Sequence, residues 1–120
     1  MAGACLLIGA TIMSLTGNVF SLHWIHSVEK IEWVEAWRIE DGALTLIEAR
    51  VKGSGAGMEP GEGAHLQDGW WVWSPETRVE ILTLAASGAT GQGWRVCDGD
   101  TCQEIGAKPG EALTLAPCGS

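Results

Sequence analysis

Apolar and polar residues alternate one by one along much of the chain, which is the period of a β-strand with one buried face. The three longest alternating runs are VFSLHWIHS (19–27), IEWVEAWRI (31–39) and ALTLIEARV (43–51). Shorter runs rich in apolar residues follow at 70–73, 78–86, 93–96, 102–105 and 111–116. Turn residues separate these runs, so each of them is predicted to be a strand.

The spacing of the runs predicts an all-β fold. With a strand pair in the opening segment, the count is about nine or ten short strands, with turn signals roughly every ten residues and no clear helix. This pattern is typical of an antiparallel β-sandwich or a partly open barrel. A chain of 120 residues is long enough for one hydrophobic core, so we expect a single β domain over residues 1–120.

Two tight turns predict how the three long runs pair. A turn at 27–30 places Trp24 opposite Trp33, and a turn at Asp41-Gly42 places Trp37 opposite Leu46. The same registers predict the further pairs His26–Ile31, Leu22–Glu35, Phe20–Trp37, Ile39–Leu44, Glu35–Glu48 and Trp33–Arg50. All of these side chains are expected on one face of a three-stranded meander, apolar at one end and mixed at the other.

Glu35 opposite Glu48 is the unusual pair, because like charges directly across a sheet repel each other. Arg50 lies one diagonal step from Glu35 and can neutralise both carboxylates, with Trp33 stacked on its guanidinium group. A proton on one carboxylate or a bound cation would have the same effect. Paired carboxylates about 5 Å apart also match the spacing of retaining glycoside hydrolases. The pattern therefore predicts one coupled cluster, with a carboxylate-based hydrolase as an alternative function.

The chain is acidic, with 15 Asp and Glu against 7 Lys and Arg, a net charge of −8 and a pI near 4.6. This charge argues against a nucleic-acid partner, because phosphate backbones are repelled. The uncharged opening MAGACLLIGATIMSL is shorter than the about 20 apolar residues of a membrane-spanning helix, so no transmembrane segment is expected. No basic residue precedes its apolar run, which favours a first strand pair over the remnant of a secretory signal.

The four cysteines form two plausible pairs. Cys97 and Cys102 bracket the turn signal DGDT, and a four-residue loop there would place them opposite each other at about 4.5–5.5 Å between Cα atoms. Cys5 and Cys118 lie near the chain ends, which domains often bring together. We therefore predict two disulfides and an oxidising compartment, with four reduced thiols in the cytosol as the alternative. The C-x₄-C spacing does not fit zinc, so no metal site is expected.

The segment GSGAGMEP (53–60) is predicted to be a glycine-rich loop that can approach a ligand closely. The third long run ends at the same end of the sheet as the 27–30 turn, so we expect the loop and the turn to meet there. The alternative is that the glycines only let the chain cross the core. The predicted binding patch comprises His26, Ser27, Glu29, Lys30, Trp33, Glu35, Glu48, Arg50, Gly55, Gly57, Met58 and Glu59.

Several of these segments resemble a bacterial family known as domain of unknown function 1850. They are FSLHWIHSVEKIEWVEAWRI, LIEARVKGSGAGMEP and DGWW, while CDGDTCQEI and a late PC resemble a subgroup. The resemblance covers nearly the whole chain and implies that residues 26–30, Trp33, Glu35 and the loop 53–60 match the family's signature. Members tend to be encoded beside tripartite (TRAP-type) transporters with a TAXI-like binding protein. This implies an accessory role at the outer face of the inner membrane.

The function expected from the sequence is that of a non-catalytic accessory or binding module without a cofactor. Its partner would be a transporter subunit, a solute-binding protein or the solute. The expected location is the periplasm or the outer face of the inner membrane, with the cytoplasm as the alternative. Two other classes stay open: a small hydrolase that uses Glu35 and Glu48, and a carbohydrate- or cation-binding β-domain that uses the tryptophans and the acidic pair.

Overall fold

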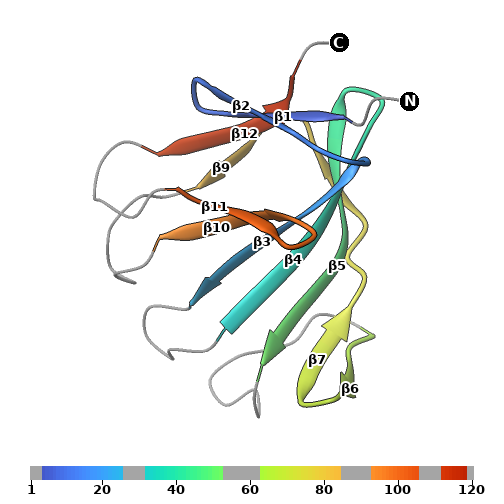
Figure 1. Ribbon diagram of the computed structural model, residues 1–120. Helices are drawn as coiled ribbons and strands as arrows, with labels where there is room; N and C mark the ends of the chain where they lie inside the picture. The colour runs from blue at the N-terminus through green and yellow to red at the C-terminus, as the bar shows by residue number, and fades with distance from the viewer. Residues whose placement is uncertain (1–3, 26–31, 53–62, 85–92, 106–111, 119–120) are drawn as a thin grey trace.

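The computed structural model describes residues 4–25, 32–52, 63–84, 93–105 and 112–118, and these residues form twelve strands and no helix (Figure 1). The strands are β1 (Cys5–Ile8), β2 (Thr11–Ser14), β3 (Val19–Ile25), β4 (Glu32–Glu40), β5 (Ala43–Lys52), β6 (His65–Gln67), β7 (Trp70–Trp73), β8 (Thr77–Val79), β9 (Leu82–Leu84), β10 (Trp94–Asp98), β11 (Thr101–Ile105) and β12 (Leu113–Pro117). The predicted all-β fold is confirmed. Nowhere in the described part of the chain is there a helix long and apolar enough to cross a membrane.

The strands form two antiparallel sheets that pack as a sandwich and do not close into a barrel. The smaller sheet has the order β2-β1-β12-β9. The larger sheet has the order β11-β10-β3-β4-β5-β7-β6, and β8 also pairs with β5. In Figure 1 the small sheet lies over the upper part of the large sheet, and the lower ends of β3, β4 and β5 extend beyond it.

The strand count exceeds the predicted nine or ten for two reasons. The run 78–86 is divided, because β8 joins the large sheet and β9 joins the small one. In addition, β6 pairs with β7 through the turn Asp68-Gly69, where φ is 51° and 85°. Asp41-Gly42 between β4 and β5 has nearly the same conformation, with φ of 53° and 73°. Positive φ at both central residues is the mark of the tight hairpin turn that Asp-Gly favours.

The core lies between the two sheets and comes from the apolar members of the alternating runs. Its most deeply buried large side chains, each no more than 1% exposed, are Leu6, Phe20, Leu22, Leu44, Val51, Val96 and Leu115. Each such side chain stabilises the fold by roughly 1.5–3 kcal/mol relative to leaving it exposed. Trp24, Trp94 and Ile105 pack against one end of this core.

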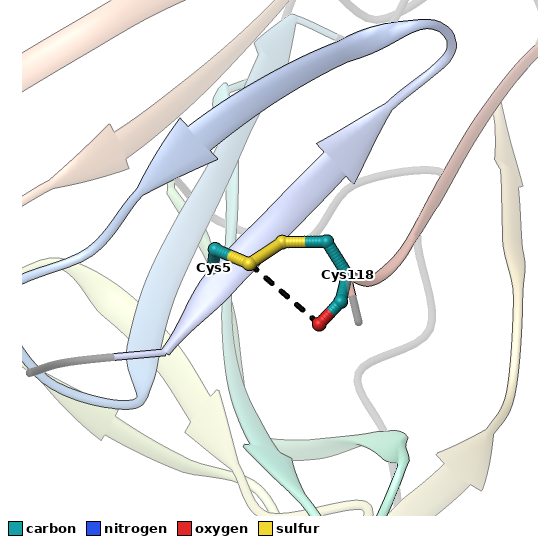
Figure 2. Close-up of a disulfide and its surroundings, with 2 residues drawn as sticks. All are labelled: Cys5 and Cys118. Carbon is teal, nitrogen blue, oxygen red and sulfur yellow. Dashed lines mark hydrogen bonds between the residues drawn. A yellow bond between two sulfur atoms is a disulfide. The ribbon is translucent and has the colours of Figure 1, made fainter. Parts of the chain in front are cut away.

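Both predicted disulfides are confirmed. Cys5 and Cys118 are joined at the two ends of the chain, with 5.5 Å between their Cα atoms, because β1 pairs directly with β12 (Figure 2). Cys97 and Cys102 are cross-strand partners with 4.1 Å between Cα atoms, slightly closer than expected. Their hairpin loop has two residues, 99–100, instead of the predicted four, because Asp98 pairs with Thr101. Two disulfides are typical of proteins in an oxidising compartment.

The opening segment and the first long hairpin fold as predicted. β1 and β2 form the expected strand pair. In the β3–β4 hairpin the pairs Phe20–Trp37, Leu22–Glu35 and Trp24–Trp33 are confirmed, whereas His26 and Ile31 lie outside the described residues. In the β4–β5 hairpin the pairs Trp37–Leu46 and Ile39–Leu44 are confirmed as well.

Beyond Trp37 the predicted register of the β4–β5 hairpin is wrong. Trp37 pairs with Leu46 but Ala36 pairs with Glu48, so Ile47 is an extra residue in β5, a β-bulge. Side chains alternate with a period of two, so one extra residue moves the rest of the strand to the opposite face. Glu35 consequently pairs with Ala49 instead of Glu48, and Trp33 pairs with Val51 instead of Arg50.

Candidate functional site

The large sheet has two chemically different faces. The inner face is turned toward the small sheet and includes Phe20, Leu22 and Trp24 of β3. The outer face is turned away and includes Ser21, His23 and Ile25 of the same strand, since alternate residues of a strand point to opposite sides. The bulge at Ile47 places Glu48 and Arg50 on the outer face and leaves Glu35 on the inner face.

The predicted cluster of Glu35, Glu48 and Arg50 is therefore divided between the two faces, and its prediction is wrong. On the outer face Arg50 forms an ion pair with Glu48, and both side chains are more than one third exposed. Trp33 is not stacked on this arginine. The guanidinium carbon of Arg50 lies 5.9 Å from the ring centroid of Trp70 instead.

Glu35 stands apart on the inner face as a half-buried carboxylate. Trp37 Nε1 donates a hydrogen bond of 3.0 Å to Glu35 Oε1. Burial raises the pKa of Glu35, and the hydrogen bond from Trp37 lowers it by less. Its strand neighbours on either side, Leu22 and Ala49, are apolar. The neighbouring hydrogen-bond donor therefore partly stabilises the charged form of Glu35, but no cation contributes to the shift of its pKa.

Trp33 belongs to a row of indole rings across the inner face. Its ring is stacked on Trp24 with 5.7 Å between centroids and 9° between planes. Trp94 lies at the other side of Trp24, at 4.9 Å, and Trp73 meets Trp33 edge-on at 6.1 Å. Such contacts add stability beyond the area buried. Trp24 and Trp94 also pack against the core, and the contacts within the row leave less aromatic surface free for a ligand.

The remaining residues of the predicted patch lie outside the described residues. They are His26, Ser27, Glu29, Lys30, Gly55, Gly57, Met58 and Glu59. The expected meeting of the 27–30 turn with the loop 53–60 also lies outside them and stays a prediction.

A pocket of about 200 Å³ opens on the large sheet where β3 ends and β4 and β10 begin. Its lining residues come from β3, β4, β10 and β11 and the residue before β10: His23, Trp24, Ile25, Glu32, Gly93, Trp94, Arg95 and Glu104. By the alternation of the strands, the side chains of His23, Ile25, Glu32, Arg95 and Glu104 belong to the outer face. Along the chain, Ile25 and Glu32 flank the segment 26–31, which lies outside the described residues.

Strand pairing sets the positions of the charged groups in this pocket. Arg95 of β10 lies between Glu104 on β11 and His23 on β3 in one cross-strand row. The next row pairs Ile25 with Glu32 of β4. Neighbouring strands lie about 4.8 Å apart, so Arg95 and Glu32 are separated by roughly 10 Å across the sheet.

The charged groups of the pocket are not paired with one another. In the described part of the chain no ion pair joins Arg95 to Glu32 or to Glu104, although Arg95 and Glu104 are direct cross-strand neighbours. On the same face, Arg38 pairs with Glu40 and Arg50 pairs with Glu48. The pocket thus holds charges that remain available to a ligand.

His23 contributes a neutral side chain to the pocket. Burial lowers its pKa, Arg95 and Arg50 lower it further, and Glu32 opposes them. Its Nε2 lies 2.8 Å from Ser21 Oγ, while its buried Nδ1 has no hydrogen-bond partner among the described residues. Within those residues there is also no group of three or more side chains able to hold a metal ion. The charged side chains and the histidine that line the pocket are suited to charge pairing and hydrogen bonding.

Sequence reasoning missed this pocket. His23 points to the face of β3 opposite the one that carries the predicted pairs, and the pairing of β10 with β3 joins residues more than seventy positions apart. No sequence motif connects Arg95 to His23. The available signal was that several polar residues in 93–105 alternate with apolar ones, and such a pattern alone does not identify a site.

Residues 20–105 match the model of a family described as Domain of unknown function (DUF1850). The chain belongs to this family. The matched span of DUF1850 contains every residue that lines the pocket and the Cys97–Cys102 disulfide, whereas Cys5 and Cys118 lie outside it. Comparisons with curated proteins and with solved structures return no match.

Proposed function

We propose that this DUF1850 protein is a non-catalytic binding module that serves a TRAP-type transporter with a TAXI-like binding protein, outside the inner membrane. The observation that supports a binding function is the pocket at the ends of β3, β4 and β10. It gathers one guanidinium group and two carboxylates that form no ion pair with one another. Sites for small ligands combine apolar and aromatic walls with a few polar groups that orient the ligand, and this pocket has both kinds of lining.

The transporter association rests on the family resemblance. The two disulfides support the location, because a periplasmic protein experiences an oxidising environment. The acidic chain also suits a protein that works beside a membrane without binding to its anionic surface.

The two other function classes have less support. A hydrolase that uses Glu35 and Glu48 needs both carboxylates to flank one bond, and here they lie on opposite faces of the sheet. A carbohydrate platform needs free aromatic faces, and Trp24, Trp33 and Trp94 are packed against one another.

A cross-linking experiment in cells tests the proposed function. The tagged protein is cross-linked in its native host, purified, and its partners are identified by mass spectrometry. We expect a TRAP permease subunit or its binding protein to be enriched. The double variant Arg95→Gln with Glu32→Gln should lose this partner, while Arg78→Gln, an exposed arginine outside the pocket, should keep it. Enrichment without any transporter component, or equal enrichment with the double variant, would contradict the proposal.

A further inference from the structure

The pocket described above has a charge pattern that selects one class of small molecule. We propose that it binds a small zwitterion of the amino-acid type, whose carboxylate pairs with Arg95 and whose ammonium group pairs with Glu32. This inference rests on the proposed binding function and specifies its ligand.

The charges of the pocket disfavour tight binding of a ligand that carries only one charge. One guanidinium group faces two carboxylates, Glu32 and Glu104, and His23 adds no positive charge because burial and Arg95 lower its pKa. A simple carboxylate can pair with Arg95 but is repelled by both glutamates. A simple amine can pair with a glutamate but is repelled by Arg95. A zwitterion pairs with both signs at once. Each charge-assisted hydrogen bond that it gains is stronger than a neutral one.

The geometry of the pocket fits the two ends of such a ligand. Arg95 and Glu32 lie on β10 and β4 with β3 between them, and the long side chains of both residues line the same cavity. His23 lies in the same cross-strand row as Arg95, and Ile25 lies opposite Glu32. These two residues form the wall between the charged groups, one able to hydrogen-bond and one apolar.

The size of the pocket favours a small ligand. Drug-sized ligands and cofactors occupy pockets of roughly 300–1,000 Å³. The cavity here is about 200 Å³, which suits a molecule of only a few heavy atoms beyond the zwitterionic group. The short apolar wall at Ile25 favours a small aliphatic side chain.

Calorimetric titration of the full chain, with its disulfides formed, tests the ligand class. The probes are glycine and L-alanine as zwitterions, propionate as the carboxylate alone and ethylammonium as the ammonium group alone. We expect saturable binding of a zwitterion, and each single-charge probe should bind at least about tenfold more weakly, the effect of losing one charge-assisted pair. Absence of saturable binding by both glycine and L-alanine at millimolar concentration would overturn the proposal.

Substitutions test whether the assigned residues hold the ligand. Arg95→Gln and Glu32→Gln should each weaken zwitterion binding at least about tenfold. Arg78→Gln and Glu80→Gln change exposed charges outside the pocket and serve as matched controls that should bind normally. Thermal unfolding of every variant shows whether it is folded, and His23→Gln supplies a second pocket variant if one of the charge variants does not fold.

The outcomes separate this inference from the proposed function. Equal binding of propionate and L-alanine, lost only in Arg95→Gln, would identify a carboxylate site and overturn the zwitterion. Loss of the cross-linked transporter partner in pocket variants, without binding of any small probe, would also overturn the zwitterion but keep the binding module. Pocket variants that retain both the cross-linked partner and the wild-type titration curve would overturn the proposed function and the zwitterion together.

Discussion

The two faces of the eight-stranded sheet are made by the same strands, yet they differ in almost every physical property. The inner face is mostly apolar and aromatic, and the half-buried carboxylate of Glu35 interrupts it. On the outer face, Arg38 and Arg50 form ion pairs, and the pocket holds charges that do not pair with one another. The comparison indicates that the inner face supplies stability and that the outer face is available for binding.

One residue decides which charges belong to which face. The bulge at Ile47 reverses the alternation of β5 after its apolar half, so Leu44 and Leu46 point into the core while Glu48 and Arg50 point away from it. Without the bulge, both charged side chains would lie on the inner face near Glu35. Burying charges there would cost several kcal/mol even if they were paired.

Deletion of Ala49 should have the largest effect of the predictions that separate the two faces. It shifts the rest of β5 by one residue, so either Glu48 or Arg50 must turn toward the core, and we expect a loss of stability of at least about 4 kcal/mol or failure to fold. Urea unfolding followed by circular dichroism measures this. Deletion of Ile47 removes only the extra residue, leaves Ala36 opposite Glu48 and Glu35 opposite Ala49, and should cost much less. An Ala49 deletion that unfolds at the wild-type midpoint would contradict the assignment of these charges to the outer face.

Removing one side chain from each face should show directly that the inner face contributes more to the stability of the fold. Phe20 is 1% exposed, so Phe20→Ala should destabilise by about 3–5 kcal/mol through lost burial and the cavity left behind. Val19, its neighbour on the outer face, is 42% exposed, and Val19→Ala should cost less than about 1 kcal/mol. Denaturant unfolding of the two variants side by side gives both values. Similar losses would contradict the assignment of the core.

The two faces should also respond to pH in opposite directions. Burial raises the pKa of Glu35, so the stability linked to this group is complete below the ordinary value of 4.5 and is lost as the pH rises through the higher folded pKa. Burial lowers the pKa of His23, so its contribution is complete above the ordinary value of 6.5 and is lost as the pH falls through the lower folded pKa.

Variants at these two positions separate the two contributions. Glu35→Gln should remove part of the loss of stability on the alkaline side of pH 4.5, and His23→Gln should remove part of the loss on the acid side of pH 6.5. Urea midpoints between about pH 4 and pH 8 measure the slopes of both variants and the wild type. If either variant follows the wild-type curve across its window, its side chain is not the titrating group.

The fold was predictable because the sequence signals for its strands and turns lie within short segments of the chain. Strict alternation in residues 19–27 and 31–39 predicted β3 and β4, and Asp41-Gly42 predicted the turn that joins β4 to β5. Asp68-Gly69 carried the same turn signal, so β6 was recognisable in principle. Both disulfides followed from a hairpin signal and from the closeness of the chain ends.

The site was missed for two reasons. A bulge is one residue without a distinctive side chain, and its only trace in ALTLIEARV is that the polar positions change phase after Leu46-Ile47, from Thr45 to Glu48 and Arg50. The pocket depends on β10 beside β3, a pairing between distant segments that no local pattern specifies. His23 and Arg95 became neighbours only through that pairing.

The most direct test of the division between the faces is one calorimetric titration with L-alanine, carried out on Arg95→Gln and on Glu35→Gln, with the melting temperature of each variant measured in parallel. We predict that Arg95→Gln binds at least about tenfold more weakly than wild type yet melts close to it, since an exposed substitution usually changes stability by no more than about 0.5 kcal/mol. Glu35→Gln should bind L-alanine as the wild type does, while its stability at neutral pH increases because the burial of a charge is relieved. Loss of binding in Glu35→Gln together with normal binding in Arg95→Gln would contradict the division, because it would place the ligand on the inner face.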